Sequence, residues 1–201
     1  LAVKDIPACH GGSARHNIGN ALAAAAAALA MGVSAEHIAT ALSRFGADPA
    51  DNPGRANVFQ INGATVLMDF GHNPEGLRAV FEIARKLPRG RLLISLGQAG
   101  DRPEEASRER SDRLNAEDPD RVLIKQMPKY ARGRDLDEVP KLLVDRLLEC
   151  GLPGDRIEVV AGEHEAVADA LAWLQPGDLA VLFVHGYIEE INAELAELAQ
   201  S

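Results

Sequence analysis

Short apolar segments alternate with helical segments of ten or more residues from residue 57 onward, and this alternation limits the possible folds more than any other feature. Apolar segments that alternate with such helices predict buried parallel strands, because helices then cover both faces of the sheet. Asn62-Gly63 separates the first two apolar segments and predicts a β-hairpin. We therefore expect an α/β fold with a mostly parallel sheet.

The predicted strands are Asn57–Ile61, Ala64–Asp69, Arg91–Leu96, Arg121–Lys125, Arg156–Val160 and Leu179–Val184. The predicted helices between them are Pro74–Lys86, Glu104–Asn115, Asp137–Glu149 and Glu163–Leu174, and a final helix is expected near Ile188–Leu198.

The first part of the chain has a different, helical character. Asn20–Met31 is rich in alanine and apolar all round, so we expect a helix that packs closely against neighbours on several sides. Gly32 is a stop signal, and Ser34 is the expected N-cap of a second helix that runs to about Phe45. The turn-rich connector over residues 46–54 then predicts a boundary between two parts of the chain.

Composition excludes several classes of protein. Of the 201 residues, 46% are hydrophobic, and this apolar content excludes disorder. The net charge of −9 argues against a general nucleic-acid or anionic-membrane surface. The longest apolar run, residues 21–31, is much shorter than the ~20 residues of a membrane span. Cys9 and Cys150 have no partner spacing, so we expect a cytoplasmic protein. A start at Leu1 suggests a processed protein or an excised fragment.

The segment after the second predicted strand gathers side chains that suit a binding site. It reads Asp69-Phe-Gly-His72-Asn73-Pro74 and presents a carboxylate, an imidazole and an amide where ligands bind such sheets. Asp69 at this point is suited to ribose hydroxyls, and His72 to stacking or hydrogen bonding. The alternative is that Asp69 only closes a turn and Asn73 only caps the helix that Pro74 begins.

Two further loops lie beyond predicted strands. Gly97-Gln-Ala-Gly100-Asp101-Arg102 has two glycines that allow a close approach to a ligand, although many such loops are only tight turns. Residues 125–134 are basic in an acidic chain. Their Arg132-Gly-Arg134 is suited to gripping a carboxylate, and a solvated basic loop is the alternative.

A fourth segment opens the alanine-rich helix. Arg15-His16-Asn17 is followed by Asn20, and Asn17 and Asn20 share a face if both are helical. Their amides can read an adenine edge or simply cap the helix. His185, after the last predicted strand, lies at a plausible site edge, whereas His37 and His164 are expected on the surface.

Several catalytic classes are excluded by absent motifs. The sequence contains no P-loop, no Gly-x-Ser-x-Gly elbow, no His-Glu-x-x-His and no paired-cysteine metal site. A nicotinamide Rossmann enzyme is disfavoured because no Gly-x-Gly-x-x-Gly follows the first strand.

Together these segments resemble the Mur ligase family, most closely its cyanophycin synthetase-type members. The resemblance is carried in order by Arg15-His-Asn-Ile-Gly-Asn20, Asp51-Asn-Pro-Gly54-Arg55, Asp69-Phe-Gly-His72-Asn73-Pro74, Gly100-Asp101-Arg102 and Arg132-Gly-Arg134. It implies that residues 1–52 end a central ATP-binding domain and that residues 53–201 form a Rossmann-like C-terminal domain. Family members use ATP and Mg²⁺ to convert a carboxylate into an acyl phosphate, which the amine of an amino acid then attacks.

The resemblance also implies roles for individual residues. His16, Asn17 and Asn20 would lie near the adenine, Arg55 would reach the nucleotide phosphates as the catalytic cation, and Asp69 and His72 would meet the ribose side. The implied amino-acid pocket consists of Asp101, Arg102, Arg132 and Arg134. No metal ligand is expected in the chain, and the magnesium ligands and P-loop would lie in a preceding domain.

The implied partners are an amino acid, a carboxylate-bearing acceptor and the preceding P-loop domain, and a homo-oligomer is compatible with the sequence. In cyanophycin-type enzymes the substrates are an acidic backbone and arginine or lysine. Val184-His185-Gly186-Tyr187 differs from the glycine-lysine-glycine ending of the peptidoglycan branch, so the substrate stays open. Without a P-loop the chain is not expected to turn over ATP alone, and a non-catalytic binding or regulatory module is the alternative.

Overall fold

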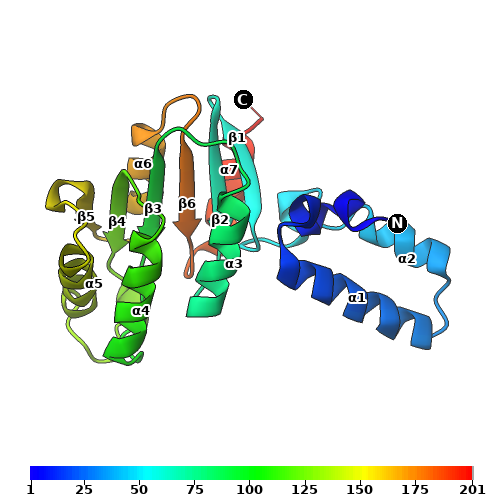
Figure 1. Cartoon of the computed structure of the whole chain (residues 1–201), viewed down its shortest axis with the longest axis horizontal. Coiled ribbons are helices and arrows are strands. Elements are labelled where there is room, and N and C mark those ends of the chain that lie inside the picture. Colours follow the sequence, from blue (N-terminus) through cyan, green and yellow to red (C-terminus); the bar gives the residue numbers. More distant parts are fainter. Residues whose placement is uncertain (201) are drawn as a thin grey trace.

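The computed structural model describes residues 1–200 and contains one six-stranded sheet beside a small helical lobe (Figure 1). The sheet order is β1-β2-β6-β3-β4-β5, with β1 antiparallel to β2 and the other pairs parallel. The strands are β1 (Asn57–Ile61), β2 (Ala64–Asp69), β3 (Leu92–Leu96), β4 (Arg121–Lys125), β5 (Ile157–Val160) and β6 (Leu179–Phe183). The expected mostly parallel α/β fold is confirmed.

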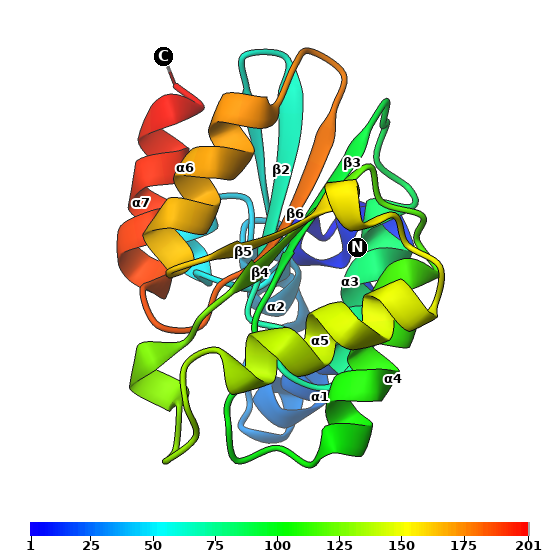
Figure 2. The ribbon, with the colours of Figure 1, turned by 90° about the vertical axis from the view of Figure 1, so that its left-hand side faces the viewer.

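Helices cover both faces of the sheet, as the turned view shows (Figure 2). They are α3 (Pro74–Ala84), α4 (Glu104–Asn115), α5 (Glu138–Glu149), α6 (Glu163–Trp173) and α7 (Ile188–Leu198). Residues of α3, α4 and α5 belong to one buried apolar cluster, and residues of α6 and α7 belong to a second on the other face. Burial of both faces explains why the central strands β2, β3 and β6 consist almost entirely of apolar residues.

The hairpin turn follows from its two residues. Asn62 and Gly63 both have positive φ angles, 49° and 79°, as the two-residue turn preferred by hairpins requires. This turn is at the end of the sheet opposite the carboxyl ends of the parallel strands. The predicted hairpin is therefore confirmed, and it lies away from the loops that hold the candidate site residues.

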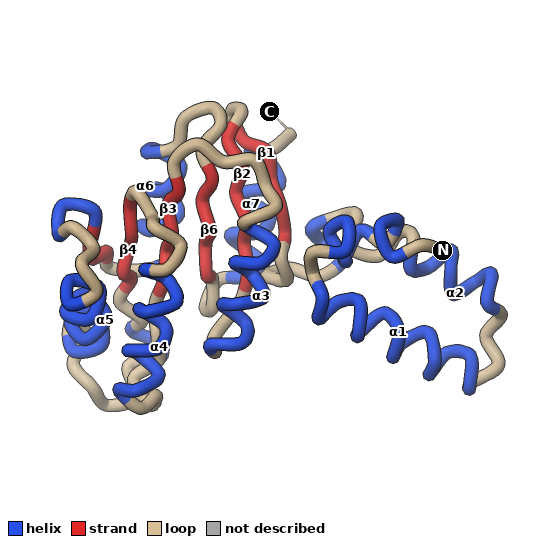
Figure 3. The backbone as a smooth tube through the Cα atoms, viewed as in Figure 1, coloured by secondary structure: helices blue, strands red, loops and turns tan. Residues whose placement is uncertain are grey.

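The helical lobe contains α1 (Arg15–Ala30) and α2 (Ala35–Leu42), with short 3₁₀ turns at Val3–Asp5, Pro7–Gly12 and Pro49–Asp51 (Figure 3). Ser34 caps α2 by accepting the N–H of His37, as predicted. The expectation that the alanine-rich helix packs on several sides is wrong for this chain. No residue of α1 is buried, because within residues 1–200 it has neighbours only along part of its surface, and Leu22 and Met31 are 66% and 84% exposed.

A short linker joins the lobe to the sheet. Gly54 lies against Ile188 at the start of α7, and a Cβ at this glycine would approach the Ile188 side chain to 2.8 Å. Asn57 donates to the carbonyl oxygens of Pro49 and Asn52, which ties the linker to β1. The linker that carries Arg55 is therefore held by tertiary contacts rather than left as a free connection.

No helix in residues 1–200 has the length and apolar character needed to cross a membrane. Cys9 is buried, Cys150 is half-buried, and both are unbridged, as expected from their spacing.

Candidate functional site

The carboxyl ends of β2, β3, β4 and β6 lie at one edge of the sheet, and the predicted site segments follow three of these strands. Two cavities open here. We call the one between α1 and the sheet the interlobe cleft and the one beside the β3 and β4 loops the arginine cavity. The arginine cavity is lined by Phe70, His72, Gly97, Gln98, Ala99, Asp101, Arg102, Arg110, Met127, Tyr130, Arg132 and His185.

The interlobe cleft has a volume of about 420 Å³ and lies between the start of α1, the linker and the loop after β2. Three of the sequence-predicted residues come from α1 and three from the other side. The structure thus brings all six together in one cleft: His16, Asn17, Asn20, Arg55, Asp69 and His72.

On the α1 side, the two asparagines are held in a fixed relation. The amide nitrogen of Asn17 donates to the carbonyl oxygen of Ala8 at 2.7 Å. The amide nitrogen of Asn20 donates to Oδ1 of Asn17 at 3.2 Å, so the two side chains share one helix face as predicted. The helix begins at Arg15 rather than near Asn20, which places His16 on its first turn.

On the sheet side, Asp69 is buried and organises the backbone around it. Its carboxylate accepts the N–H of Ala56 at 2.8 Å and the N–H of Gly71 at 2.6 Å. Burial raises the pKa of Asp69, and these two backbone hydrogen bonds oppose that rise. Asp69 thus closes the turn after β2, and Asn73 caps α3 by accepting the N–H of Gly76 at 2.7 Å.

Arg55 and His72 are both exposed on this side. The guanidinium of Arg55 lies 5.2 Å from the centre of the Phe70 ring, and the ring centres of Phe70 and His72 are 5.0 Å apart. Partial burial, together with the charges of nearby arginines, lowers the pKa of His72. His72 lines both cavities and is therefore the point where they meet.

The arginine cavity, about 170 Å³, contains three of the four residues predicted for the amino-acid pocket: Asp101, Arg102 and Arg132. Arg134 does not line it, and its guanidinium instead pairs with Glu138 at 2.9 Å. The cavity has a larger share of cationic than acidic side chains. Such a lining suits a small anionic or zwitterionic ligand.

The two glycines of the β3 loop have a packing role. A Cβ at Gly100 would lie 2.0 Å from the carbonyl oxygen of Ala131, and a Cβ at Gly97 would lie 2.8 Å from Lys125 and Met127. Gly100 also donates its N–H to the carbonyl oxygen of Tyr130 at 2.9 Å. These glycines therefore bring Asp101 and Arg102 beside the loop that carries Arg132.

Sequence reasoning did not identify Arg110, Gln98 or Tyr130 as lining residues, and it gave His185 only a place at the site edge. Arg110 and Gln98 are buried, and His185 is 8% exposed. The spacing of the buried α4 residues Ser107, Arg110, Ser111 and Leu114 follows a helix face, but most of them are polar. That periodicity is the signal that could have indicated Arg110.

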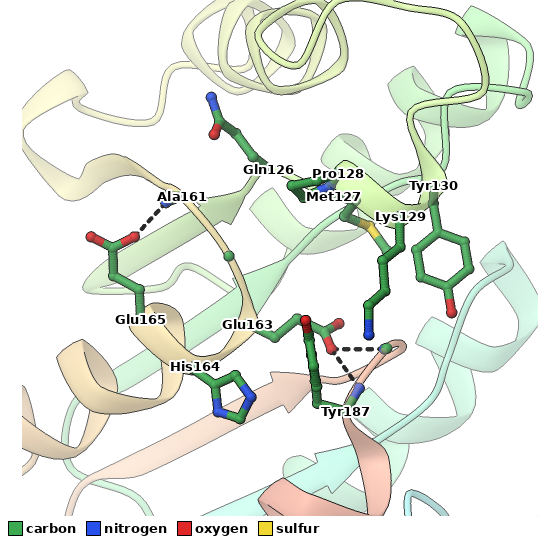
Figure 4. Close-up of a pocket in the computed structure, with 12 residues that line it drawn as sticks. Gln126, Met127, Pro128, Lys129, Tyr130, Ala161, Glu163, His164, Glu165 and Tyr187 are labelled. Carbon is green, nitrogen blue, oxygen red and sulfur yellow. Dashed lines mark hydrogen bonds between the residues drawn. The ribbon is translucent and has the colours of Figure 1, made fainter.

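A third cavity of about 310 Å³ lies where the β4, β5 and β6 loops meet, and we call it the Tyr187 cavity (Figure 4). The ammonium of Lys129 lies 3.6 Å from the centre of the Tyr187 ring. Its lining is Gln126, Met127, Pro128, Lys129, Tyr130, Ala161, Gly162, Glu163, His164, Glu165, Gly186 and Tyr187. Met127 and Tyr130 also line the arginine cavity, so the two cavities adjoin.

A buried ion pair lies under the Tyr187 cavity. Lys125 donates to Glu163 at 2.6 Å and to the carbonyl oxygen of Phe183. The same carboxylate accepts the backbone N–H groups of His185, Gly186 and Tyr187. Burial alone would raise the pKa of Glu163. The contacts of its carboxylate with His185 and Lys125 outweigh this effect and hold the pKa well below its usual range. The sequence analysis placed Lys125 in a basic loop, but its side chain is buried and paired with Glu163.

Comparison with known proteins identifies the class. The family described as "Mur ligase, glutamate ligase domain" matches residues 54–186. The chain belongs to this family, as the sequence resemblance predicted.

Curated relatives named as synthetases and as ligases match most of the chain. The chain is 34% identical over 188 residues to a cyanophycin synthetase of Crocosphaera subtropica. This match covers 94% of the chain and 21% of the synthetase. The chain is 32% identical over 176 residues to a UDP-N-acetylmuramoyl-L-alanyl-D-glutamate–2,6-diaminopimelate ligase of Gloeobacter violaceus, covering 85% of this chain and 33% of that one. The chain thus spans between about a fifth and a third of these relatives.

Solved structures share the fold. UDP-N-acetylmuramate-alanine ligase of Thermotoga maritima superposes with a TM-score of 0.63 at 17% identity, over 92% of this chain and 38% of that one. Mycobacterium tuberculosis folylpolyglutamate synthase complexed with ADP gives a TM-score of 0.53 at 18% identity, over 82% and 39%. At these identities the likeness concerns the fold alone.

Proposed function

We propose that this chain is the C-terminal part of an ATP-dependent ligase that forms an amide bond between a carboxylate and an incoming amino acid. Residues 1–52 would end the central ATP-binding domain, and residues 53–201 would form the domain that closes over the reaction. The observation that carries the proposal is the gathering of six predicted residues, from both sides, in the interlobe cleft. Relatives named as a cyanophycin synthetase and as a ligase support the same reaction class.

The cleft suits a nucleotide by its chemistry. It offers amides from Asn17 and Asn20 for a base edge and the permanent cation of Arg55 for phosphates. The buried Asp69 is occupied by two backbone N–H groups, so its contribution to ribose binding would use remaining lone pairs. ATP supplies the phosphoryl group that turns the carboxylate into an acyl phosphate with a better leaving group, and Mg²⁺ would be held by the preceding domain.

The arginine cavity would receive the amino acid. Arg102 and Arg132 suit its carboxylate, Asp101 suits its ammonium group, and Arg134 would act only if it leaves Glu138. Because His72 lines both cavities, the amine would enter beside the nucleotide end of the cleft. If the amine and the acyl phosphate are held side by side in this way, their reaction no longer depends on a random encounter in solution.

Binding of a non-hydrolysable ATP analogue with Mg²⁺ tests the proposal by calorimetry on this chain. Arg55→Ala should weaken binding at least tenfold with an unchanged unfolding midpoint. Arg89→Ala, an exposed arginine before β3 at the opposite end of the sheet, is the matched control and should bind like wild type. Equal affinity of the Arg55→Ala and Arg89→Ala variants would remove Arg55 from the nucleotide site.

The catalytic part of the proposal needs the gene upstream of Leu1. A Gly-x-x-x-x-Gly-Lys-Ser/Thr sequence there, together with phosphate release that depends on an added amino acid, is the expected result. In that longer protein, Arg55→Ala should abolish amide formation. A start codon immediately before Leu1 would instead favour the non-catalytic binding or regulatory module.

A further inference from the structure

Phe70 follows the last residue of β2, and its ring contacts side chains from the linker, from its own loop and from the loop after β6. Its ring centre is 5.2 Å from the guanidinium carbon of Arg55, 5.0 Å from the ring centre of His72 and 5.3 Å from that of His185. Phe70 is half-buried and lines the arginine cavity, whereas Arg55 lines the interlobe cleft. Phe70 therefore contacts residues of both cavities.

The guanidinium of Arg55 has an unusual partner for this chain. Arg55 is exposed, and within residues 1–200 its guanidinium forms no ion pair and no hydrogen bond. Other arginines of the chain, such as Arg78 and Arg146, donate to carboxylates. Arg55 has the aromatic ring of Phe70 in place of a carboxylate.

The kind of partner decides what the guanidinium of Arg55 can still bind. A carboxylate would neutralise the charge of Arg55 and occupy its N–H donors. An aromatic ring attracts the cation through its electron-rich face and leaves both the charge and the N–H donors available. Without such a contact an exposed arginine samples many rotamers, and ordering them when a ligand binds costs free energy. The ring therefore restricts the guanidinium and leaves it able to bind an anion.

Phe70 is itself held on two sides. Its backbone N–H donates to the carbonyl oxygen of Gly54, the residue before Arg55, at 2.8 Å. Its ring meets the buried ring of His185 at an interplanar angle of 62°. The backbone N–H of His185 in turn donates to the buried carboxylate of Glu163 at 2.6 Å. The exposed side chain of Arg55 thus lies against a ring whose own position is fixed.

We propose that Phe70 is a positioning residue for Arg55, and that its ring holds the guanidinium in place for the phosphates of a nucleotide in the interlobe cleft. The choice of nucleotide phosphates rests on the proposed function, whereas the restriction of Arg55 by the ring is a property of the free chain. Phe70 does not itself line the interlobe cleft, so it acts on the nucleotide through Arg55.

The first test is NMR relaxation of the arginine Nε–H groups in the 201-residue chain without nucleotide, with Arg55→Lys to identify the Arg55 signal. Arg55 should move less than Arg89, an exposed arginine before β3. Phe70→Leu should raise the mobility of Arg55 to that of Arg89, and Phe70→Tyr, which keeps the ring, should not. The proposal is overturned if Arg55 is as mobile as Arg89 in the wild-type chain, or if Phe70→Leu leaves its mobility unchanged.

The second test is a double-mutant cycle, measured by calorimetry with a non-hydrolysable ATP analogue and Mg²⁺. Phe70→Leu should weaken binding about two- to fivefold, as expected for an exposed cation–π contact, and Phe70→Tyr should bind like the wild type. In the Arg55→Ala background Phe70→Leu should have no further effect. An equal loss in both backgrounds would mean that Phe70 acts through the fold alone, which overturns the proposal.

Phe81→Leu is the control for a general loss of stability. Phe81 is buried, and its ring centre lies 5.8 Å from that of Phe183 in the core. This variant should lower the unfolding midpoint and leave the mobility of Arg55 and the nucleotide affinity unchanged. Phe70→Met replaces Phe70→Leu if the latter does not fold. If the wild-type chain binds no nucleotide, the proposed function fails, whereas the measurement on the free chain still decides whether Phe70 holds Arg55.

Discussion

The carboxylate of Asp69 accepts the backbone N–H of Ala56 at 2.8 Å, so the last residue of β2 fixes the linker that carries Arg55. Ala56 has a φ of +54°, a conformation that a non-glycine residue adopts only when its surroundings impose it. On the other side of Arg55, the carbonyl oxygen of Gly54 accepts the N–H of Phe70 at 2.8 Å. Arg55 is thus anchored through both of its neighbours, Ala56 to the last residue of β2 and Gly54 to the first residue after it.

Asp69→Asn keeps the size of this side chain but leaves a single oxygen to accept from Ala56 and Gly71. We expect a loss of about 1–3 kcal/mol in the free energy of unfolding, because one buried N–H loses its acceptor. Nucleotide affinity should fall as well, since Arg55 is displaced. Urea unfolding and calorimetry measure the two effects. Asp51→Asn, whose carboxylate accepts the exposed N–H of Gly46, should be nearly neutral, and a neutral Asp69→Asn would contradict the anchoring role.

Glu163→Ala tests the buried ion pair. It removes the partner of Lys125 and the acceptor of three backbone N–H groups, so we expect a loss of about 3–5 kcal/mol in the free energy of unfolding. Glu165→Ala is the matched control because, within residues 1–200, this exposed carboxylate accepts only the N–H of Ala161. Chemical denaturation measures the free energy of unfolding of both variants. Similar losses in the two variants would show that the buried ion pair stabilises the fold no more than an exposed carboxylate does.

His185 makes the stability depend on pH. Burial lowers the pKa of His185 to about 4. The charges of Lys125 and Arg110 also lower this pKa, whereas Glu163 opposes the shift. The Phe70 ring packs against the imidazole. The unfolded chain, with a pKa of about 6.5, therefore binds the extra proton first, and stability falls as the pH drops from about 6.5 to about 4. His185→Gln should reduce this slope by up to about 1.4 kcal/mol per pH unit. His164→Gln, at an exposed histidine, is the control. If the pH dependence of stability in His185→Gln is the same as in this control, His185 is not its source.

The exposed apolar residues of α1 allow a test of the lobe. Leu22→Glu and Met31→Glu should leave the free energy of unfolding within about 0.5 kcal/mol of wild type, because both side chains are exposed. Urea unfolding of both variants and of the wild-type chain measures the effect. A large loss of stability would mean that this surface is covered in solution.

Most of the fold could be predicted because periodicity and turn chemistry agree with burial. Two helices and three strands have the predicted bounds, namely Glu104–Asn115, Ile188–Leu198, Asn57–Ile61, Ala64–Asp69 and Arg121–Lys125. The other elements from residue 57 onward differ from the prediction by one or two residues at an end. The extent of α1 was underestimated because Arg15, His16 and Asn17 are polar and lack a capping signal, although they form its first turn.

The site was harder to predict, since burial of charge leaves no hydrophobic pattern. Arg110 lies in a helix whose buried face is mostly polar, and Lys125 ends a strand in the middle of a basic run. Sequence spacing gave no indication that one would be unpaired and the other paired with Glu163. The carboxylate of Asp69 was recognised, but its acceptance of the distant Ala56 N–H depends on the path of the linker.

The two-sided construction of the interlobe cleft has a dynamic consequence. Three of its predicted contacts come from α1, a helix without buried residues, and three from the linker and the β2 loop. A molecule held from both sides would couple the opening of α1 to that of the sheet. The amides of α1 should then exchange their hydrogens quickly in the free chain and acquire the slow exchange of the sheet when the cleft is filled.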